Sequence, residues 1–435
     1  MTQTPAECPS GPTDAVSDFR FLSLRFVSYF LFLTSYLVFQ TRLSIPLLLV
    51  LLGAAPCPAQ SPASKPFRDF RRHPTEYAGP GLSDPEPQDV KEVLLGYFGP
   101  SDPAHPEGGD LWRAAQMAID EANRQGGYQG KPFRLAPAWS ENPWAAGVAQ
   151  MARIVFRDKP WAIVGGIDGP STHLAEQVVV KARLTLVSPV STDKTVNLVN
   201  IPWMFSLAPG DHLLAPVLAD AIARRAGRKP WVLASAEDHD SRLFVTELSK
   251  RLTGHRLVPV RQFEFGSQDA PWAALADRAL EAKPEAVIVV AAAQPSARLV
   301  GALRSRGFSG TIYGGPWMAR RRFLGEAGAA AEGAILPLVC DPQALAPAFV
   351  RAFQTRYGVE PDYAAAQTYD AVRLLVAAIG RAGLNRARIR AAVHELAPWP
   401  EVTGTIAWDP AQSNTRPALL GTIRHGRVEP LAGEG

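Results

Sequence analysis

The chain has 435 residues, of which 47% are apolar and 20% are charged. This balance is typical of a globular protein and excludes a disordered chain, a collagen-like repeat and a small disulfide-rich scaffold. Lysine and arginine exceed the acidic residues by only 45 to 41 and form no long basic run, so we predict no nucleic-acid partner. The three cysteines form neither a CxxC pair nor a cysteine–histidine cluster, so we predict no structural zinc site. No other pattern in the sequence indicates a metal or a cofactor, and we predict neither.

Residues 1–59 differ in composition from the rest of the chain. An apolar run over 21–39 is followed by Arg42, by a second apolar run over 43–55 and then by small residues. We interpret this segment as an export signal cleaved after Ala59, because a short apolar core before small residues is typical of one. The alternative is a membrane anchor formed by the two runs together, although Arg42 divides them. Both interpretations predict a periplasmic protein, either free or tethered to the membrane by this segment.

A series of short apolar runs alternating with amphipathic segments begins at Val93. Residues 60–90, before it, are rich in proline, serine and charge, and we interpret them as a tether. Asp110 is suited to cap a helix that Gly126 and Gly127 would end. The series is expected to contain strands at 93–98, 133–139, 161–164 and 184–187, with helices at 110–125, from 143 onward and at 172–182.

A second series of the same kind follows a break near residues 208–211. Its expected strands are 231–234, 257–263, 286–291 and 311–313, and its helices lie near 212–226, 240–253, 271–282 and 295–306. A long helix over 363–382 and a strand over 403–408 complete the chain. Alternating strands and helices require parallel sheets covered by helices, so we predict an α/β protein of two lobes, each a mostly parallel sheet flanked by helices.

Three loops of the first lobe, at the carboxyl ends of strands, contain unusual chemistry. Open α/β sheets bind ligands at this edge. The first loop, 99–110, is long and polar and contains Ser101 and Asp102; the second, 165–172, is rich in glycine and runs directly into a helix. Free N–H groups at a helix N-terminus suit a carboxylate. The candidate residues of the second and third loops are Gly169, Ser171, Thr172, Ser191 and Thr192. Each hydroxyl has the alternative role of capping a helix.

The second lobe offers loops at 235–240, 291–294 and 314–318. The run from Glu237 to Asp240 is not expected to bind a metal ion, because consecutive residues cannot all face one ion. His239 is interpreted as a pocket wall or a capped loop residue. Trp317 is either a core anchor or a lid over the apolar part of a ligand.

These loops, in this order, resemble the type I periplasmic binding proteins, in particular the leucine/isoleucine/valine-binding family that serves ABC importers. The resemblance covers residues 93–426. It is carried by Gly96-Tyr97-Phe98-Gly99-Pro100, Gly109-Asp110, Ala118-Ile119-Asp120-Glu121-Ala122-Asn123, Val164-Gly165-Gly166, Ser171-Thr172, Val187-Ser188-Pro189 and Gly404-Thr405-Ile406-Ala407-Trp408-Asp409. It implies three crossing segments, near 208–212, 336–342 and 409–415, and hinge closure over a small molecule. The implied lobes are 91–209 with 340–410, and 210–339 with 411–435.

The resemblance also implies site residues. The family holds a ligand carboxylate with the turn at 169–172 and with Val190 and Thr192, and His239 stands where the family often has a stacking aromatic. The acid that holds an ammonium group would lie at about Pro316 and is absent, and the family's second-lobe aromatic is replaced by Ala292. The family's small disulfide is missing, with Glu141 near one of its positions. We therefore expect a ligand without an essential ammonium contact. The candidate replacement acids are Asp102, Glu107, Asp168, Glu237 and Asp238.

Motif absences exclude the obvious catalytic classes. The sequence contains no GxSxG nucleophile elbow, no GxGxxG fingerprint and no phosphate-binding P-loop. We predict a non-enzymatic, extracytoplasmic solute-binding protein that delivers a small polar ligand, amino acid-like, carboxylate or amide, to the membrane permease of an ABC importer. The alternative is a sensory subunit that signals to a partner protein, and an α/β hydrolase is disfavoured.

Overall fold

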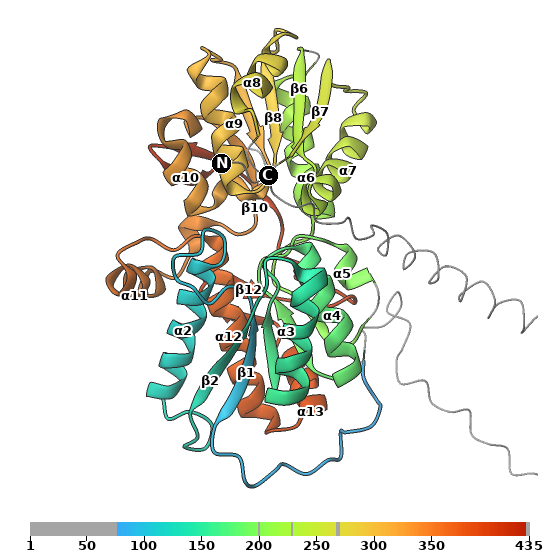
Figure 1. The fold of residues 1–435 in the computed structure, drawn as a ribbon, viewed down its shortest axis with the longest axis vertical. Helices are drawn as coiled ribbons and strands as arrows, with labels where there is room; N and C mark the ends of the chain where they lie inside the picture. The colour runs from blue at the N-terminus through green and yellow to red at the C-terminus, as the bar shows by residue number, and fades with distance from the viewer. Residues whose placement is uncertain (1–75, 199–200, 228, 267–269, 432–435) are drawn as a thin grey trace, which may run out of the picture. The chain divides into compact units, whose positions relative to one another are not determined.

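The computed structural model describes residues 76–431 apart from 199–200, 228 and 267–269. The predicted export signal therefore lies outside the described residues. Within them the chain forms two α/β lobes, each built on its own sheet (Figure 1). The predicted fold class is confirmed. None of the described helices has the length and hydropathy that crossing a bilayer requires.

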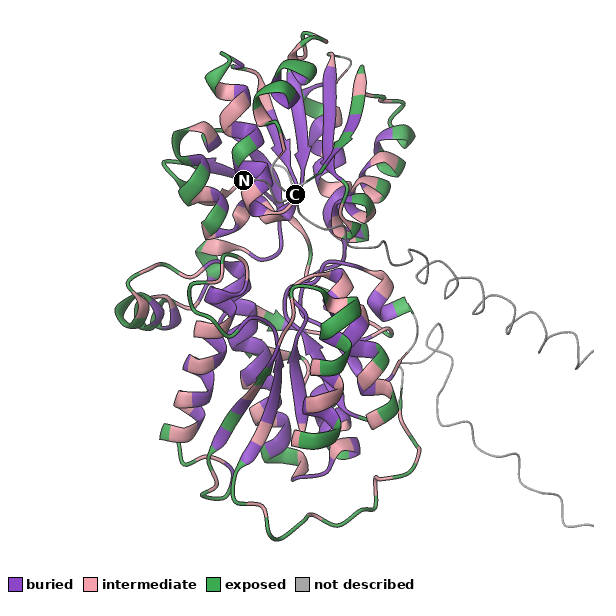
Figure 2. Ribbon diagram, viewed as in Figure 1, coloured by how far each residue is buried: buried purple, intermediate pink, exposed green. Residues whose placement is uncertain are grey.

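The first lobe contains a parallel five-stranded sheet of order β2-β1-β3-β4-β5. Its strands are β1 (Val93–Phe98), β2 (Phe133–Ala138), β3 (Ala162–Gly165), β4 (Thr185–Ser188) and β5 (Met204–Ser206). β1, β3 and β4 are buried on both faces because helices cover the sheet (Figure 2). These helices include α2 (Gly109–Arg124), α3 (Val148–Ala152), α4 (Gly169–Ala182), α5 (Thr195–Leu198), α12 (Tyr363–Ala382) and α13 (Arg386–Glu395). The π-helical turns η1 (Pro143–Gly147) and η2 (Arg153–Asp158) flank α3, and the hairpin of β11 (Trp399–Glu401) and β12 (Gly404–Ile406) follows α13.

The second lobe contains a seven-stranded sheet of order β14-β13-β10-β9-β8-β6-β7. The neighbouring strands from β6 to β10 run parallel, and β13 and β14 are antiparallel additions at one edge. The strands are β6 (Trp231–Ala236), β7 (Arg261–Phe265), β8 (Ala286–Val290), β9 (Thr311–Gly314), β10 (Ile335–Leu338), β13 (Leu419–Arg424) and β14 (Arg427–Pro430). The helices are α6 (Asp211–Arg225), α7 (His239–Gly254), α8 (Trp272–Leu280), α9 (Ala293–Ser305) and α10 (Arg321–Ala327), with the 3₁₀ turns η3 (Pro316–Ala319) and η4 (Gly328–Ala331).

The strand expected at 257–263 is displaced in the structure. β7 begins at Arg261 and ends at Phe265, and the preceding residues are irregular. Val258 and Val260 are 72% and 55% exposed, so their apolar side chains do not face a core. Phe263 and Phe265 alternate into the core instead. The apolar run was misleading because β-branched residues also occur in exposed edge loops.

The chain passes between the lobes three times within the described residues: between β5 and α6, between β10 and α12, and between β12 and β13. η5 (Pro342–Ala344) and α11 (Pro347–Tyr357) lie on the second passage. The first and third crossings lie side by side, because Ser206 N–H donates to Gln412 O at 3.1 Å and Asn414 N–H donates to Ser206 O at 3.0 Å. The first and third crossings therefore form a hydrogen-bonded pair of segments between the lobes.

The described part of the predicted tether, residues 76–90, is attached to the first lobe. The Tyr77 ring lies 4.6 Å from the Trp203 ring between centroids. The Asn385 amide donates to Gly81 O at 2.8 Å, and the Tyr128 hydroxyl donates to Glu86 at 2.7 Å. These contacts anchor this stretch to the lobe surface.

Candidate functional site

The turn after β3 and the turn after β6 meet across the two lobes. In the first sheet, β1 lies between β2 and β3, so the connections after β1 and β3 leave in opposite directions; β6 and β8 have the same relation in the second sheet. Such switch points are where open α/β sheets bind ligands. Gly169 N–H, at the start of α4, donates to both carboxylate oxygens of Asp240, in the first turn of α7, at 3.1 and 3.0 Å.

The first-lobe turn is a closed hydrogen-bonded cap. The Asp168 carboxylate accepts from Ser171 N–H at 2.8 Å, and the Ser171 hydroxyl oxygen accepts from Ile167 N–H at 3.0 Å. The Thr172 hydroxyl donates to Asp168 O at 2.7 Å. Both hydroxyls are fully buried. They therefore hold the turn in shape, and the polar group that the turn presents to the second lobe is Gly169 N–H.

Glycine at position 169 permits the approach of the second lobe. A Cβ atom there would lie 2.3 Å from Asp240 Oδ1 and 3.0 Å from the His239 ring. A carboxylate at a helix N-terminus is favoured by the free N–H groups and the positive end of the helix dipole. Burial is the main cause that raises the pKa of Asp240 well above its usual range, the charge of Asp168 adds to it, and the Gly169 N–H opposes it. The first lobe thus offers an anion site, and the second lobe places the carboxyl group of Asp240 in it.

The segment after β4 connects the site to the hinge. Val190, Ser191 and Thr192 are all buried. The Thr192 carbonyl accepts from Asp211 N–H at 2.8 Å, at the start of α6, and the Ser191 hydroxyl accepts from Asp193 N–H at 3.4 Å. Thr192 therefore contacts the start of the second lobe at the first crossing.

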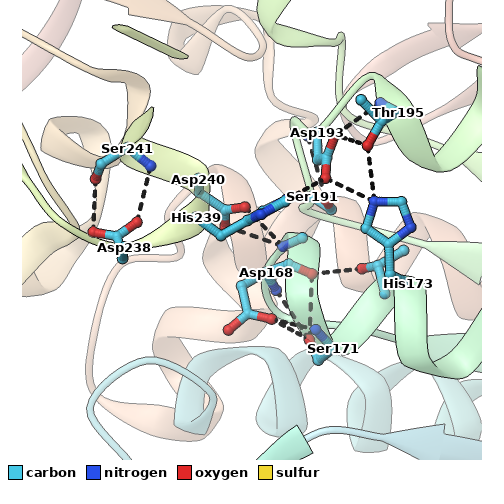
Figure 3. Close-up of polar contacts among 12 residues, drawn as sticks. Asp168, Ser171, His173, Ser191, Asp193, Thr195, Asp238, His239, Asp240 and Ser241 are labelled. Carbon is cyan, nitrogen blue, oxygen red and sulfur yellow. Dashed lines mark hydrogen bonds and ion pairs between the residues drawn. The ribbon is translucent and has the colours of Figure 1, made fainter. Parts of the chain in front are cut away.

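Two histidines and an aspartate meet beside this contact. Asp193 Oδ2 lies 3.0 Å from His173 Nε2 of α4 and 2.8 Å from His239 Nε2 of α7 (Figure 3). Hydrogen bonds to the Asp193 and Glu176 carboxylates raise the pKa of His173 to about 9, although burial opposes this rise. Hydrogen bonds from His173, Thr195 and His239 hold the pKa of Asp193 below its usual range despite its burial. The three donor atoms are close enough to share one metal ion.

The remaining predicted residues lie outside this cluster of contacts. Ser101 and Asp102 are exposed, and the Asp102 carboxylate accepts from Ala104 N–H at 2.8 Å within its own loop. Ala292 is the N-cap residue of α9. Trp317 is half-buried, and its ring packs edge-on against Phe244 of α7 at 5.8 Å between centroids.

A second set of contacts between the lobes was not expected from the sequence. The Arg321 guanidinium donates twice to the Asp110 carboxylate, both at 2.9 Å. Arg320 donates to Asp362 at 2.8 Å and to the Glu107 carbonyl at 2.7 Å. These partners are more than 40 residues apart in the chain, so no local pattern links them.

The end of β1 presents an unpartnered hydroxyl. Among the described residues, Tyr97 Oη is buried and has no hydrogen-bond partner. Burial raises the pKa of this hydroxyl, and the charge of Arg320 opposes the rise. Its position at a switch-point strand end makes Tyr97 a further candidate for ligand contact.

A hollow of about 620 Å³ lies beside the second crossing, lined in part by Arg321, Cys340 and Tyr363. Another of about 580 Å³ lies near the first and third crossings, lined in part by Lys194 and Asp409. Neither hollow includes Gly169 or Asp240 in its lining. We place the candidate site at the facing turns because they join both switch points.

Comparison with known proteins gives a consistent picture. A family model described as "Periplasmic binding protein" matches residues 98–427. The chain is 25% identical over 328 residues to an amino acid binding protein of Pseudomonas aeruginosa PAO1, covering 74% of this chain and 87% of that protein. The fold is similar to that of the branched-chain amino acid transporter substrate-binding protein LivJ of Streptococcus pneumoniae in complex with isoleucine, with a TM-score of 0.71 and 21% identity over 78% of this chain and 99% of that chain. It is also similar to an ABC transporter solute-binding protein of R. palustris in complex with benzoate, with a TM-score of 0.70 and 17% identity over 78% of this chain and 95% of that one.

Proposed function

Because the chain belongs to the periplasmic binding protein family, we propose that it binds a small zwitterionic, amino acid-like solute between its lobes and delivers it to the permease of an ABC importer. Membership of the family makes the chain a binding protein and confirms the prediction that it is not an enzyme. The family is extracytoplasmic, and the proposed compartment is the periplasm, reached through the N-terminal segment. The observation that carries the proposed ligand class is the contact between Gly169 N–H and the Asp240 carboxylate.

This contact fills the anion site with an acidic side chain of the protein itself, whose ionised form is disfavoured there by burial. Gly169 N–H belongs to the first lobe and Asp240 to the second, so the contact exists only while the lobes meet. A zwitterion can replace it with two contacts. The ligand's carboxylate takes Gly169 N–H, and its ammonium takes the released Asp240 carboxylate. Both lobes are then bound through the ligand, which is how a solute favours the closed arrangement of a hinged protein.

Asp240 supplies the acid that the resemblance placed at about Pro316. An ammonium without a partner in a desolvated cleft costs several kcal/mol, so a binding protein for amino acids needs such an acid. Burial is the main cause that raises the pKa values of both Asp168 and Asp240, and the charge of Asp168 raises the pKa of Asp240 further. A cationic group between them relieves this repulsion. The ligand we propose therefore carries an ammonium, in contrast to the expectation from the sequence.

The relatives support a carboxylate in the ligand, whereas the ammonium is supported by the amino acid binding protein and the isoleucine complex but not by the benzoate complex. The Pseudomonas relative is named as an amino acid binding protein, and the two structures hold isoleucine and benzoate, which both carry a carboxylate. Trp317 lies beside Phe244, one helical turn after Asp240 on α7, so an apolar ligand side chain would meet an aromatic surface there.

The test is a calorimetric titration of the purified protein with the amino acid that most raises its melting temperature. The same titration uses the corresponding acid without the amino group and the corresponding amine without the carboxylate. We expect the zwitterion to bind at least tenfold more tightly than either analogue, since a hydrogen bond to a charged group contributes about 1.5–3 kcal/mol. Asp240→Asn keeps the shape and an acceptor for Gly169 N–H, and should lower affinity for the zwitterion at least tenfold.

Glu237→Gln is the matched control, because Glu237 is an exposed acid in the same turn. It should leave affinity within twofold of the wild type. Equal affinity of the wild type for the amino acid and its deaminated analogue would contradict the proposed role of Asp240, as would unchanged affinity in Asp240→Asn.

A further inference from the structure

We propose that His173, Asp193 and His239 form a binding site for one divalent transition-metal ion, such as Zn²⁺, that links the two lobes. The three residues come from α4, from the segment after β4 and from the first turn of α7. This site lies beside the proposed solute site and does not depend on it. The run from Glu237 to Asp240 was set aside as a metal site on sequence grounds; only His239 of that run takes part, and the other two donors come from the first lobe.

The donor atoms are spaced for an ion. All three lie within 4.8 Å of one another, and Asp193 Oδ2 is 3.0 and 2.8 Å from the two Nε2 atoms. Zinc binds histidine and carboxylate donors at about 2.0–2.2 Å, which separates neighbouring donors by about 3.3 Å in a tetrahedral site. The distances from Asp193 Oδ2 to the two imidazole nitrogens are therefore within about half an ångström of the spacing that an ion requires.

Two of the donors have the outer contacts that a metal site requires. Asp193 Oδ1 accepts from Thr195 N–H at 2.7 Å and from the Thr195 hydroxyl at 2.6 Å, which directs Oδ2 toward the histidines. His173 Nδ1 lies 3.5 Å from Glu176 Oε2. A carboxylate behind a histidine fixes the orientation of the ring and makes the other nitrogen a better ligand. Glu176 is buried, and within the described residues its Oε1 has no hydrogen-bond partner.

The donor set selects the kind of ion and leaves it accessible. Two imidazoles and one carboxylate favour Zn²⁺ and neighbouring transition metals over Ca²⁺ and Mg²⁺, which prefer all-oxygen sites. Asp193 is fully buried, whereas the His239 side chain is 42% exposed. Solvent therefore reaches the second-lobe side of the site, where water can complete the coordination.

Metal binding and lobe position are linked in this arrangement. His173 and Asp193 belong to the first lobe and His239 to the second, so the full donor set exists only when the lobes meet. A ligand that binds one arrangement better shifts the population toward it. The ion is expected to hold the lobes together.

The test is a calorimetric titration of Zn²⁺ into chelator-treated protein without a polyhistidine tag and without amino acid. We expect one equivalent to bind, and at least tenfold weaker binding in both His173→Gln and His239→Gln. Glu176→Gln should weaken binding by about 10–100-fold, the usual effect of losing an outer partner of a metal ligand. Small-angle scattering should show that Zn²⁺ reduces the radius of gyration of the wild type but not of His239→Gln.

His255→Gln is the matched control. His255 Nε2 also contacts a carboxylate, Asp220 Oδ1 at 2.6 Å, but no second histidine joins that pair among the described residues. The control should bind Zn²⁺ as the wild type does, and circular dichroism establishes that each variant is folded. The proposal is overturned if the wild type binds no equivalent of Zn²⁺, if His173→Gln or His239→Gln binds as the wild type does, or if His255→Gln weakens binding equally. Because the titration uses Zn²⁺ without amino acid, a failure of the metal proposal would not count against the proposed solute binding.

Discussion

The turns that meet between the lobes use the same cap but present opposite chemistry. Asp168 accepts from Ser171 N–H at 2.8 Å at the start of α4, and Asp238 accepts from Ser241 N–H at 2.9 Å at the start of α7. The two residues between aspartate and serine differ. They are Gly169 and Pro170 in the first lobe, and His239 and Asp240 in the second.

This difference shows how one local structure can serve as either half of a binding site. Where the residue after the aspartate is glycine, no side chain covers the helix N-terminus, and the glycine N–H is available to an acceptor. Where the two residues after the aspartate are histidine and aspartate, the same kind of turn projects side chains toward the other lobe. Both turns have the same aspartate–serine cap, which positions the two residues between them. Those two residues differ between the turns, and this difference makes the turns complementary.

The largest expected effect comes from adding a side chain at Gly169. Gly169→Ala should weaken solute binding at least 100-fold, because its Cβ would lie 2.3 Å from Asp240 Oδ1 and 2.9 Å from Asp193 Oδ2. The free energy of unfolding should change little, since the lobes can separate to relieve the clash. Calorimetry and denaturant unfolding measure the two quantities.

Gly301→Ala is the control for this variant, because a Cβ at Gly301 in α9 would meet nothing within 4 Å. It should bind normally and be slightly more stable, since alanine is the better helix former by about 1 kcal/mol. Normal solute binding by Gly169→Ala would show that the turns do not need to approach closely.

A third aspartate can be compared with the capping residues Asp168 and Asp238, because it also accepts backbone N–H groups but does not cap a helix. Asp370, on α12, accepts from Val402 N–H and Thr403 N–H, both at 3.1 Å, and burial raises its pKa to about 7. The unfolded pKa is about 3.9, so between about pH 4 and 7 the folded state holds a proton that the unfolded state releases. This group therefore makes stability fall as the pH rises through that range, by about 1.4 kcal/mol per pH unit at most.

Denaturant unfolding of the wild type and of Asp370→Asn at pH 5 and pH 7 measures the contribution of Asp370 to the pH dependence of stability. We expect the variant to lose about 2 kcal/mol less stability than the wild type between these pH values. The same pH dependence in both proteins would show that burial does not govern this carboxyl.

The smallest expected effect is the difference in stability between variants that lose the serine of one cap or of the other. Ser171→Ala should destabilise the protein more than Ser241→Ala, by roughly 1 kcal/mol, because the Ser171 hydroxyl also accepts from Ile167 N–H. The Ser241 hydroxyl bonds to Asp238 at 2.7 Å. Unfolding free energies of the two variants, measured side by side, give the difference. Equal losses would mean that the caps are energetically equivalent and that only Gly169, Pro170, His239 and Asp240 distinguish the turns.

Most of the fold follows from periodicity along the sequence. The strand β1 and the helix α12 have the predicted limits, Val93–Phe98 and Tyr363–Ala382. Each has a regular apolar pattern and a clear end, Gly99 after the strand and Gly383 after the helix. The strand expected at 257–263 is wrong because apolar character alone does not show whether a segment faces a core.

The site is less accessible to sequence reasoning because it is assembled from distant segments. The loops that contain Gly169 and His239 could be singled out, since glycine and polar residues follow predicted strands there. The pairing of Gly169 with Asp240 spans 71 residues, and that of Asp193 with His239 spans 46. Nothing local determines which member of an acidic run turns inward, so Asp240 was not among the expected acids.

The most direct test of the paired turns is a crystal structure of the protein with its preferred amino acid bound. The account predicts the ligand carboxylate within hydrogen-bonding distance of Gly169 N and its ammonium on the Asp240 carboxylate. A complex in which Asp240 still occupies Gly169 N–H, with the amino acid held elsewhere, would contradict it.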